Sequence, residues 1–424
     1  MKFIDFDTHY LNVECFKYVK PEYKTIVPQF NWKYYDSEPS WWKKSYPLDS
    51  DPAQSITGEN KYSWKHGLLA DENGFHDIDN FPGGKSRTLN MVKVGIEKKR
   101  VWNKLHTGPM RGDLHYTLSE YRNLDKRKEH LDSTGIHKAL LNPYNFMVGL
   151  NYRTDPDLAY EMAKSYNKTV TEDCMSSDSL WANIWFPAQN KNMKQNLDLI
   201  EEGLANNAVG VLIGQHFSYP DNIPGRFWGD CDWMESFWSH ANVHQYPVIC
   251  HVQDDWYDLS IYHHLVPQYK IIDWKNKNKF LLNIFGHYPH PSLMRQLSWV
   301  SFITSGILDR YPNLRMVYSE SNLDWILPLI EKLSVALNRD CSHYLNNWNF
   351  SFDTEEPNLI DNIKLIGSNK LIFSTDTPHD DLSGRGRHFD VNNLLTMDIS
   401  DYDKDLISSK NAIKLLDKTN FNMN

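Results

Sequence analysis

Short apolar runs recur along the chain, and most of them are separated by segments with helical periodicity. Eight runs predict strands, over 2–9, 138–142, 180–186, 209–213, 246–250, 280–285, 314–318 and 370–374. The intervals predict helices over about 127–134, 157–175, 191–206 and 232–242, one from about 291 and one ending near 337. Apolar runs that alternate with helices are typical of parallel βαβ units. Eight such units predict an α/β fold, a closed (β/α)8 TIM barrel.

Residues 10–119 do not follow this alternation. They are rich in Trp, Tyr, Pro, Gly and Asp and show little periodicity. A structureless loop of that length is uncommon inside a compact domain. We therefore interpret 10–119 as a large insertion after the first strand, a lid packed on the barrel mouth. Residues 1–9 and 120–424 then form the catalytic barrel domain.

Composition narrows the class of protein. The chain has 424 residues, 41% of them hydrophobic, so it can bury a large core. Its net charge of -9 and the lack of a basic stripe argue against nucleic acid as a partner. Its five cysteines have no C-x-x-C spacing, which suits reduced thiols in the cytoplasm. No long apolar run or N-terminal apolar segment predicts a membrane span, so we expect a cytoplasmic protein.

The first strand ends in two residues of metal-ligand type, Asp7 and His9. Side chains two apart on a strand point the same way, so both can reach one ion. Such a pair is weak evidence alone, but later predicted strands are also followed by ligand-type residues. These are His251, His287, His290, Glu320 and Asp376.

In a TIM barrel, the residues that follow the strands meet at one mouth, where the catalytic groups lie. Histidines and carboxylates gathered there suit a borderline or hard divalent ion. Two of each predict one zinc or manganese ion with a position open for water.

Several motifs occur in a fixed order along the chain. They are IDFDTH at 4–9, RKEHLDSTGIHKALLN at 127–142, YPVICH at 246–251, HPSLMR at 290–295, SGILDRYPNLR at 305–315 and FSTDTPH at 373–379. With these motifs the sequence resembles the amidohydrolase-related group of the amidohydrolase superfamily. That group contains aminocarboxymuconate-semialdehyde decarboxylase and the resorcylate-type decarboxylases. The resemblance covers the first strand and roughly residues 120–418.

The resemblance implies roles for particular residues. The metal ligands would be Asp7, His9, His251 and Asp376, and His290 would be the acid/base that touches the substrate. His287, three residues earlier, competes with His290 for that role. Glu320 is expected either to hydrogen-bond a ligand histidine or to cap the following helix. His379 is expected in the turn after the last strand.

The favoured function is hydrolysis of a small organic substrate by a metal-activated water. Asp376 would accept the proton of the water, and His290 would stabilise the oxyanion or protonate the leaving group. The same ligands would equally serve a metal-dependent non-oxidative decarboxylase of a small aromatic or unsaturated carboxylic acid. A binding protein built on an inactive barrel is the third reading. The group often forms dimers, so a homodimer is expected.

Overall fold

The computed structural model describes a large part of the chain. The described residues are 1–10, 15, 17–21, 70–71, 74–75, 124–143, 156–188, 190–214, 227–251, 289–320, 322–354, 356, 358–377 and 390–416. Most of the predicted insertion, 10–119, therefore lies outside the described residues. Its role as a lid on the mouth stays a prediction.

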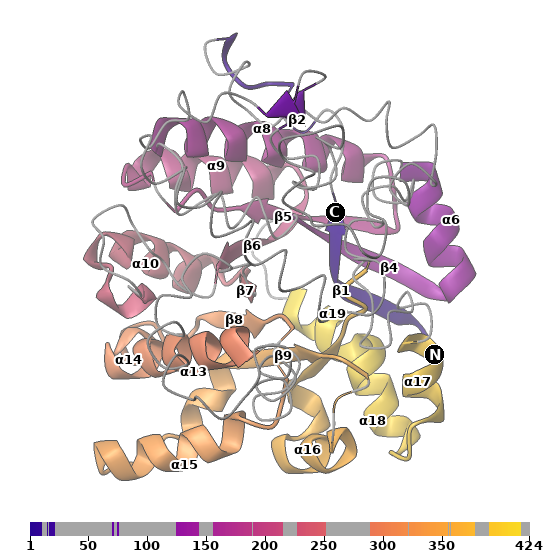
Figure 1. Ribbon diagram of the computed structural model, residues 1–424, viewed down its shortest axis with the longest axis vertical. Coiled ribbons are helices and arrows are strands. Elements are labelled where there is room, and N and C mark those ends of the chain that lie inside the picture. The colour runs from indigo at the N-terminus through magenta and orange to yellow at the C-terminus, as the bar shows by residue number, and fades with distance from the viewer. Residues whose placement is uncertain are drawn as a thin grey trace.

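Eight parallel strands form one sheet in chain order, with helices around the outside (Figure 1). They are β1 (Phe3–Tyr10), β4 (Ile136–Pro143), β5 (Leu180–Trp185), β6 (Ala208–Gly214), β7 (Pro247–His251), β8 (Arg315–Tyr318), β9 (Trp348–Phe352) and β10 (Leu371–Phe373). Backbone bonds join the last strand to the first: His9 N–H donates to Thr377 O at 2.8 Å, and Asp376 N–H to Asp7 O at 2.9 Å. These bonds bring the edge strands together, so the sheet is the predicted (β/α)8 barrel.

The helices are amphipathic and cover the strands. They are α6 (Leu124–Thr134), α8 (Pro156–Met175), α9 (Met193–Ala205), α10 (Glu235–His244), α13 (Pro289–Thr304), α14 (Ile307–Arg310), α15 (Ile326–Leu337), α16 (Leu359–Ile366), α17 (Asp390–Thr396), α18 (Asp401–Asp405) and α19 (Asn411–Leu416). A separate hairpin pairs β2 (Ala70–Asp71) with β3 (Gly74–Phe75). Local signals set several helix ends. Asn192 caps α9 by accepting from Gln195 N–H, and Gly135, with φ of +79°, follows α6.

Apolar side chains lie on both faces of the strands, which is why the strands appear in the sequence as continuous apolar runs. Leu140 points into the barrel, whereas Ala139 and Leu141 pack outward against the helices. The inner core contains Ile4, Phe6, Leu140, Val209, Leu212, Ile249, Val317 and Ile372, with Ala412, Leu415 and Leu416 of α19. Helix α19 also binds the start of β8, because the Arg315 guanidinium donates to Leu415 O. The helix therefore lies at the end of the barrel opposite the strands' carboxyl ends.

One predicted strand needs correction. The seven predicted strands other than 280–285 match β1, β4, β5, β6, β7, β8 and β10. Residues 280–285 lie outside the described residues, and β7 pairs directly with β8, so no strand separates those two. The remaining barrel strand is β9, which we did not predict. Its sequence WNFSF alternates apolar and polar residues and lacks the continuous apolar run used to find the others.

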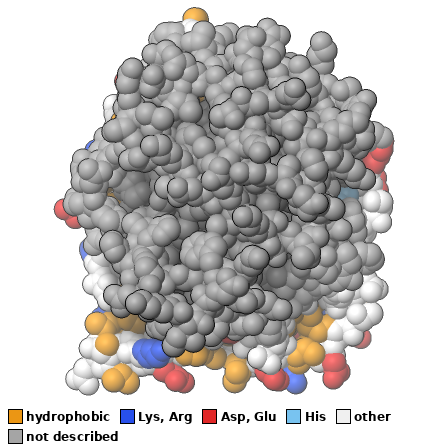
Figure 2. Space-filling view, viewed as in Figure 1, with side chains coloured by type: hydrophobic (Ala, Val, Ile, Leu, Met, Phe, Trp, Pro, Cys, Tyr) orange, Lys and Arg blue, Asp and Glu red, His pale blue; other side chains and the backbone are white. Residues whose placement is uncertain are grey.

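The described surface is mixed in character. Along the lower edge of Figure 2, hydrophobic, acidic and basic side chains lie beside one another, over the region where Figure 1 draws α15 and α16. Val335 of α15 and Leu365 of α16 are exposed. Isolated apolar side chains of this kind are ordinary on a protein surface. None of the helices in the described ranges is long and apolar enough to cross a bilayer.

Candidate metal centre

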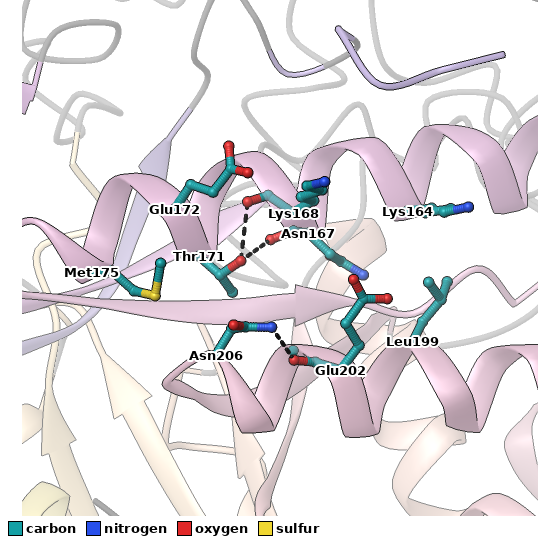
Figure 3. A pocket seen from close by; sticks show the side chains of 10 residues that line it. Lys164, Asn167, Lys168, Thr171, Glu172, Met175, Leu199, Glu202 and Asn206 are labelled. Carbon is teal, nitrogen blue, oxygen red and sulfur yellow. Dashed lines mark hydrogen bonds between the residues drawn. The ribbon is translucent and has the colours of Figure 1, made fainter. Parts of the chain in front are cut away.

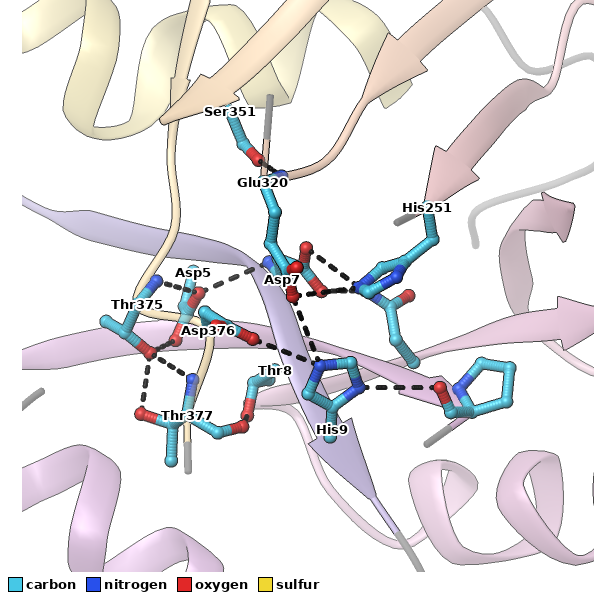
Figure 4. Close-up of polar contacts among 12 residues, drawn as sticks. Asp5, Asp7, Thr8, His9, His251, Glu320, Ser351, Thr375, Asp376 and Thr377 are labelled. Atoms are coloured by element: carbon cyan, nitrogen blue, oxygen red, sulfur yellow. Dashed lines mark hydrogen bonds and ion pairs between the residues drawn. The ribbon is translucent and has the colours of Figure 1, made fainter. Parts of the chain in front are cut away.

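Five ligand-type side chains from four parts of the sequence meet at the carboxyl ends of the barrel strands (Figure 4). Asp7 and His9 come from the end of β1, and His251 ends β7. Glu320 follows β8, and Asp376 follows β10. The structure thus brings together the four predicted ligands and adds Glu320 to them. Within this set, Asp7, His9 and His251 form one compact group, and His9, Glu320 and Asp376 form another.

His251 lies between two of the carboxylates. Its Nε2 atom is 3.3 Å from Asp7 Oδ2 and 3.4 Å from Glu320 Oε1. The imidazole and the Asp7 carboxylate are fully buried, and 15% of the Glu320 side chain is exposed. The His251 ring also meets the His9 ring edge to face, with centroids 5.0 Å apart. Both imidazoles therefore face the same small space.

His9 faces the other carboxylates of the group. Its Nε2 atom is 3.1 Å from Asp376 Oδ1 and 3.6 Å from Glu320 Oε1. Its Nδ1 atom is 3.4 Å from Pro143 O, a carbonyl that can only accept. A neutral ring that carries its proton on Nδ1 can donate to this carbonyl, and it then turns the Nε2 lone pair toward the carboxylates.

This donor set fits a divalent cation. With only Nδ1 protonated, the His9 Nε2 lone pair faces carboxylate oxygens, and a cation placed between them would compensate their repulsion. Asp7 Oδ2 is buried and accepts no hydrogen bond from the part of the chain that is described. A buried carboxylate oxygen is costly unless a cation or a donor compensates it. Imidazole nitrogens combined with carboxylate oxygens are ligands that zinc and manganese accept.

Two of the acidic residues have a strained backbone. Glu320 has φ of +52° and Asp376 has φ of +53°, in the left-handed region that residues other than glycine rarely enter. Asp376 is held there by its backbone bond to Asp7, and Glu320 N–H donates to Ser351 Oγ at 3.1 Å. Strain of this kind is common at functional sites, where it directs a side chain. Here the turn at Asp376 directs its carboxylate to His9, and the turn at Glu320 directs its carboxylate to His9 and His251.

Asp5 supports the site without joining it. Its carboxylate accepts from Thr375 N–H at 2.9 Å and from the Thr375 hydroxyl at 2.5 Å, and it also accepts from Asp7 N–H. Burial raises the pKa of Asp5 to about 7, although these hydrogen bonds oppose the shift. Asp5 therefore ties the segment before Asp376 to the end of β1.

The remaining candidate residues are three histidines, of whose side chains the structure describes none, and Glu320, which it places. His287, His379 and the side chain of His290 lie outside the described residues, so their roles stay predictions. The backbone of His290 is helical, as the second residue of α13. Glu320 follows the sixth barrel strand, not the seventh as the sequence suggested. It does not cap the following helix, because the N-cap of α15 is Trp325.

A second acidic group lies next to the segment after Glu320. Glu356 accepts from Leu323 N–H at 2.9 Å and from Asp353 N–H at 3.1 Å. Burial, with a smaller contribution from the Asp353 carboxylate, raises the pKa of Glu356 to about 8. The buried Arg295 guanidinium of α13 opposes this shift but does not cancel it.

The raised pKa of Glu356 predicts a pH-dependent stability. An unfolded glutamate ionises near its ordinary pKa of 4.5, but Glu356 stays protonated in the folded protein until about pH 8. Its contribution to stability is complete below pH 4.5 and is lost as the pH rises to 8. Between pH 5 and pH 8 the wild type should therefore lose about 3.5 kcal/mol more unfolding free energy than Glu356→Gln. Urea unfolding at both values measures this difference, and equal losses would contradict it.

A small pocket lies elsewhere, between α8 and α9 (Figure 3). Its volume is about 140 Å³, and none of its lining residues belongs to the metal centre. Several polar groups in it already have partners in the protein: Thr171 donates to Asn167 O, Asn206 to Glu202 O, and the Glu172 carboxylate accepts from the Tyr18 hydroxyl.

The eight-stranded parallel barrel, with ligand-type side chains gathered at its mouth, has the architecture of the amidohydrolase fold. A family model described as Amidohydrolase (Amidohydro_2) matches residues 114–418, which is most of the chain. The chain therefore belongs to this amidohydrolase family, as the sequence resemblance implied. Members of the amidohydrolase superfamily are enzymes, so this protein is an enzyme and the binding-barrel reading is set aside. No curated protein matches the chain.

Solved structures with the same fold include hydrolase-type and decarboxylase members. An amidohydrolase from Mycobacterium avium subsp. paratuberculosis K-10 aligns with a TM-score of 0.65 and 20% identity, over 98% of this chain and 99% of that chain. A dihydroxybenzoic acid decarboxylase from Polaromonas sp. JS666, with bound manganese and the inhibitor 2-nitroresorcinol, gives 0.55 and 16%, over 70% and 87%. The 5-carboxyvanillate decarboxylase of Sphingomonas paucimobilis gives 0.54 and 14%, over 75% and 90%. At these identities the likeness concerns the fold.

Proposed function

We propose that this protein is a metal-dependent hydrolase that cleaves a bond next to a carbonyl group in a small organic molecule. One divalent ion, zinc or manganese, would be held by Asp7, His9, His251 and Asp376. The observation that carries the proposal is the meeting of two imidazoles and three carboxylates at the mouth of the barrel. When bound, such an ion lowers the pKa of a water ligand and polarises a carbonyl oxygen.

The chain's own residues then supply binding and proton transfer. Asp376 is the base that takes the proton from the attacking water, with its carboxylate held 3.1 Å from His9 Nε2. Glu320 is a fifth ligand-type side chain beside the four proposed ligands. Its side chain is 15% exposed, so a substrate can reach it. His290 is the proposed donor to the developing oxyanion or the leaving group.

Decarboxylation of a small aromatic or unsaturated acid is the second candidate. The decarboxylases of Polaromonas and Sphingomonas share the fold, and the former binds manganese and an aromatic inhibitor. In that reaction Asp376 or His290 would protonate the carbon that loses carbon dioxide. A cytoplasmic location and a homodimeric assembly remain predictions under either function.

One experiment distinguishes the two reactions. Metal-stripped protein is reconstituted with zinc or manganese and given a panel of amides, esters and lactones, and separately a panel of hydroxybenzoic acids. Hydrolysis predicts carboxylic acid that incorporates ¹⁸O from labelled water, with no carbon dioxide. Release of carbon dioxide from the acids alone would favour the second candidate. Protein that takes up no divalent metal would contradict both.

A further inference from the structure

We infer that Asn142 and Asn183 form a hydrogen-bonded ladder inside the barrel that positions Asp7 as a one-oxygen metal ligand. The inference rests on the proposed function only in requiring that the centre binds a divalent ion. The two asparagines are positioning residues, since neither one is among the proposed ligands. All three side chains are fully buried.

The ladder crosses three neighbouring strands. Asn142 of β4 donates its side-chain N–H to Asp7 Oδ1 of β1 at 2.5 Å. Asn183 of β5 donates in turn to Asn142 Oδ1, also at 2.5 Å. Asn142 lies two residues after Leu140, which points into the barrel core, so its side chain points inward as well. The polar ladder thus lies between that apolar core and the metal centre.

The direction of these bonds fixes which oxygen of Asp7 meets the ion. Oδ1 is occupied by the Asn142 amide, and Oδ2 is 3.3 Å from His251 Nε2. If the Asn142 amide were reversed, its oxygen would face Asp7 Oδ1 and its NH₂ would face that of Asn183. Both contacts would be repulsive. Because the Asp7 carboxylate can only accept, it sets the orientation of the Asn142 amide, and Asn142 Oδ1 then sets that of Asn183.

A glycine on the next strand makes room for the far end of the ladder. Gly210 of β6 pairs with Asn183 in the sheet. A Cβ atom at Gly210 would lie 2.7 Å from Asn183 Oδ1 and 3.0 Å from Pro247 O, closer than real side chains pack. The glycine therefore leaves the space that the Asn183 amide occupies.

The ladder is not explained by stability. Asn183 Oδ1 is buried and has no hydrogen-bond partner among the described residues. An unsatisfied buried polar atom of this kind costs free energy, and apolar side chains would fill the same space without that cost. Polar groups that orient a metal ligand are kept for their effect on the metal.

The test measures metal affinity on purified, metal-stripped protein. Asn142→Leu removes the bond to Asp7 with little change in volume, and should raise the Kd for zinc and for manganese by roughly 10- to 100-fold. Asn183→Leu should raise it by less, because it acts only through Asn142. The double variant should have the same metal Kd as Asn142→Leu. Once Asn142 is replaced, Asn183 no longer has a hydrogen bond through which it can influence Asp7. Calorimetric or chelator-competition titrations supply the Kd values.

A matched control is a buried asparagine outside the site. Asn196 of α9 is fully buried and bonds to Asn190 O at 2.7 Å. Asn196→Leu should lower the unfolding midpoint and leave the metal Kd unchanged. If Asn142→Leu does not fold, as judged by circular dichroism, Asn142→Ala and Asn142→Ser take its place.

The outcomes separate this inference from the proposed function. The inference is overturned if a folded Asn142 variant binds metal with the wild-type Kd. It is also overturned if the increase in metal Kd in the double variant equals the product of the increases in Asn142→Leu and Asn183→Leu. Wild-type protein that binds metal but hydrolyses nothing overturns the proposed hydrolysis and leaves the Kd comparison intact. Wild-type protein that binds no divalent metal overturns both.

Discussion

Replacing His251 with alanine is expected to abolish stoichiometric metal binding and turnover while the barrel stays folded. The imidazole is fully buried at the end of β7 and lies within 3.4 Å of two carboxylate oxygens. Its loss removes one of two nitrogen ligands and leaves the carboxylates to repel one another. A metal ion contributes several kcal/mol to the transition state, so turnover should fall by roughly 10³-fold or more.

Elemental analysis and activity assays on the same purified sample measure this effect. The change truncates one buried side chain, which should lower the unfolding free energy by about 1–3 kcal/mol. His240→Ala is the matched control. His240 of α10 bonds the Tyr246 hydroxyl at 3.1 Å and lies 3.3 Å from Glu201, outside the metal centre. The control should keep its metal, and full metal with normal turnover in His251→Ala would refute the assignment.

Asp376→Asn is expected to lower turnover by roughly 10²- to 10⁴-fold, the usual share of a positioned acid or base. Asparagine tolerates the left-handed backbone at this position, where φ is +53°. The backbone N–H bond to Asp7, which joins the last strand to the first, is also retained. The variant should therefore fold, and its amide oxygen still leaves a weak ligand for the ion.

Glu320→Gln is the comparison that identifies the base. Glu320 also has a left-handed backbone and also faces His9 and His251. If Asp376 is the base, kcat should fall much further in Asp376→Asn than in Glu320→Gln at equal metal content. The reverse order would transfer the role to Glu320. Equal metal content must be shown by elemental analysis, because loss of the ion would also abolish turnover.

The sequence determined the fold through local chemistry. Because both faces of a parallel barrel strand are buried, such a strand is a continuous apolar run in the sequence. Seven of the predicted runs coincide with barrel strands. The strand β9 was not predicted, because Asn349 and Ser351 interrupt its apolar residues. Ser351 accepts a hydrogen bond from Glu320 N–H at the mouth, so one of the two polar residues that interrupt this strand lies at the candidate site.

The sequence also predicted which residues meet at the mouth, because the topology of a parallel barrel makes strand ends converge. Asp7 and Asp376 are separated by nearly the whole chain, yet closure of the sheet joins their backbones. That convergence follows from strand order alone.

Only the tertiary structure decided how the side chains face one another. The sequence left Glu320 between a hydrogen bond to a histidine and a helix cap. The structure places its Oε1 atom 3.4 Å from His251 Nε2 and 3.6 Å from His9 Nε2, and the N-cap of α15 is Trp325. It gave no sign that Asn142 and Asn183 meet Asp7, because an asparagine in an apolar run is locally indistinguishable from any other buried polar residue. Hydrogen-bond direction depends on register between neighbouring strands, and register is set by packing of the whole barrel.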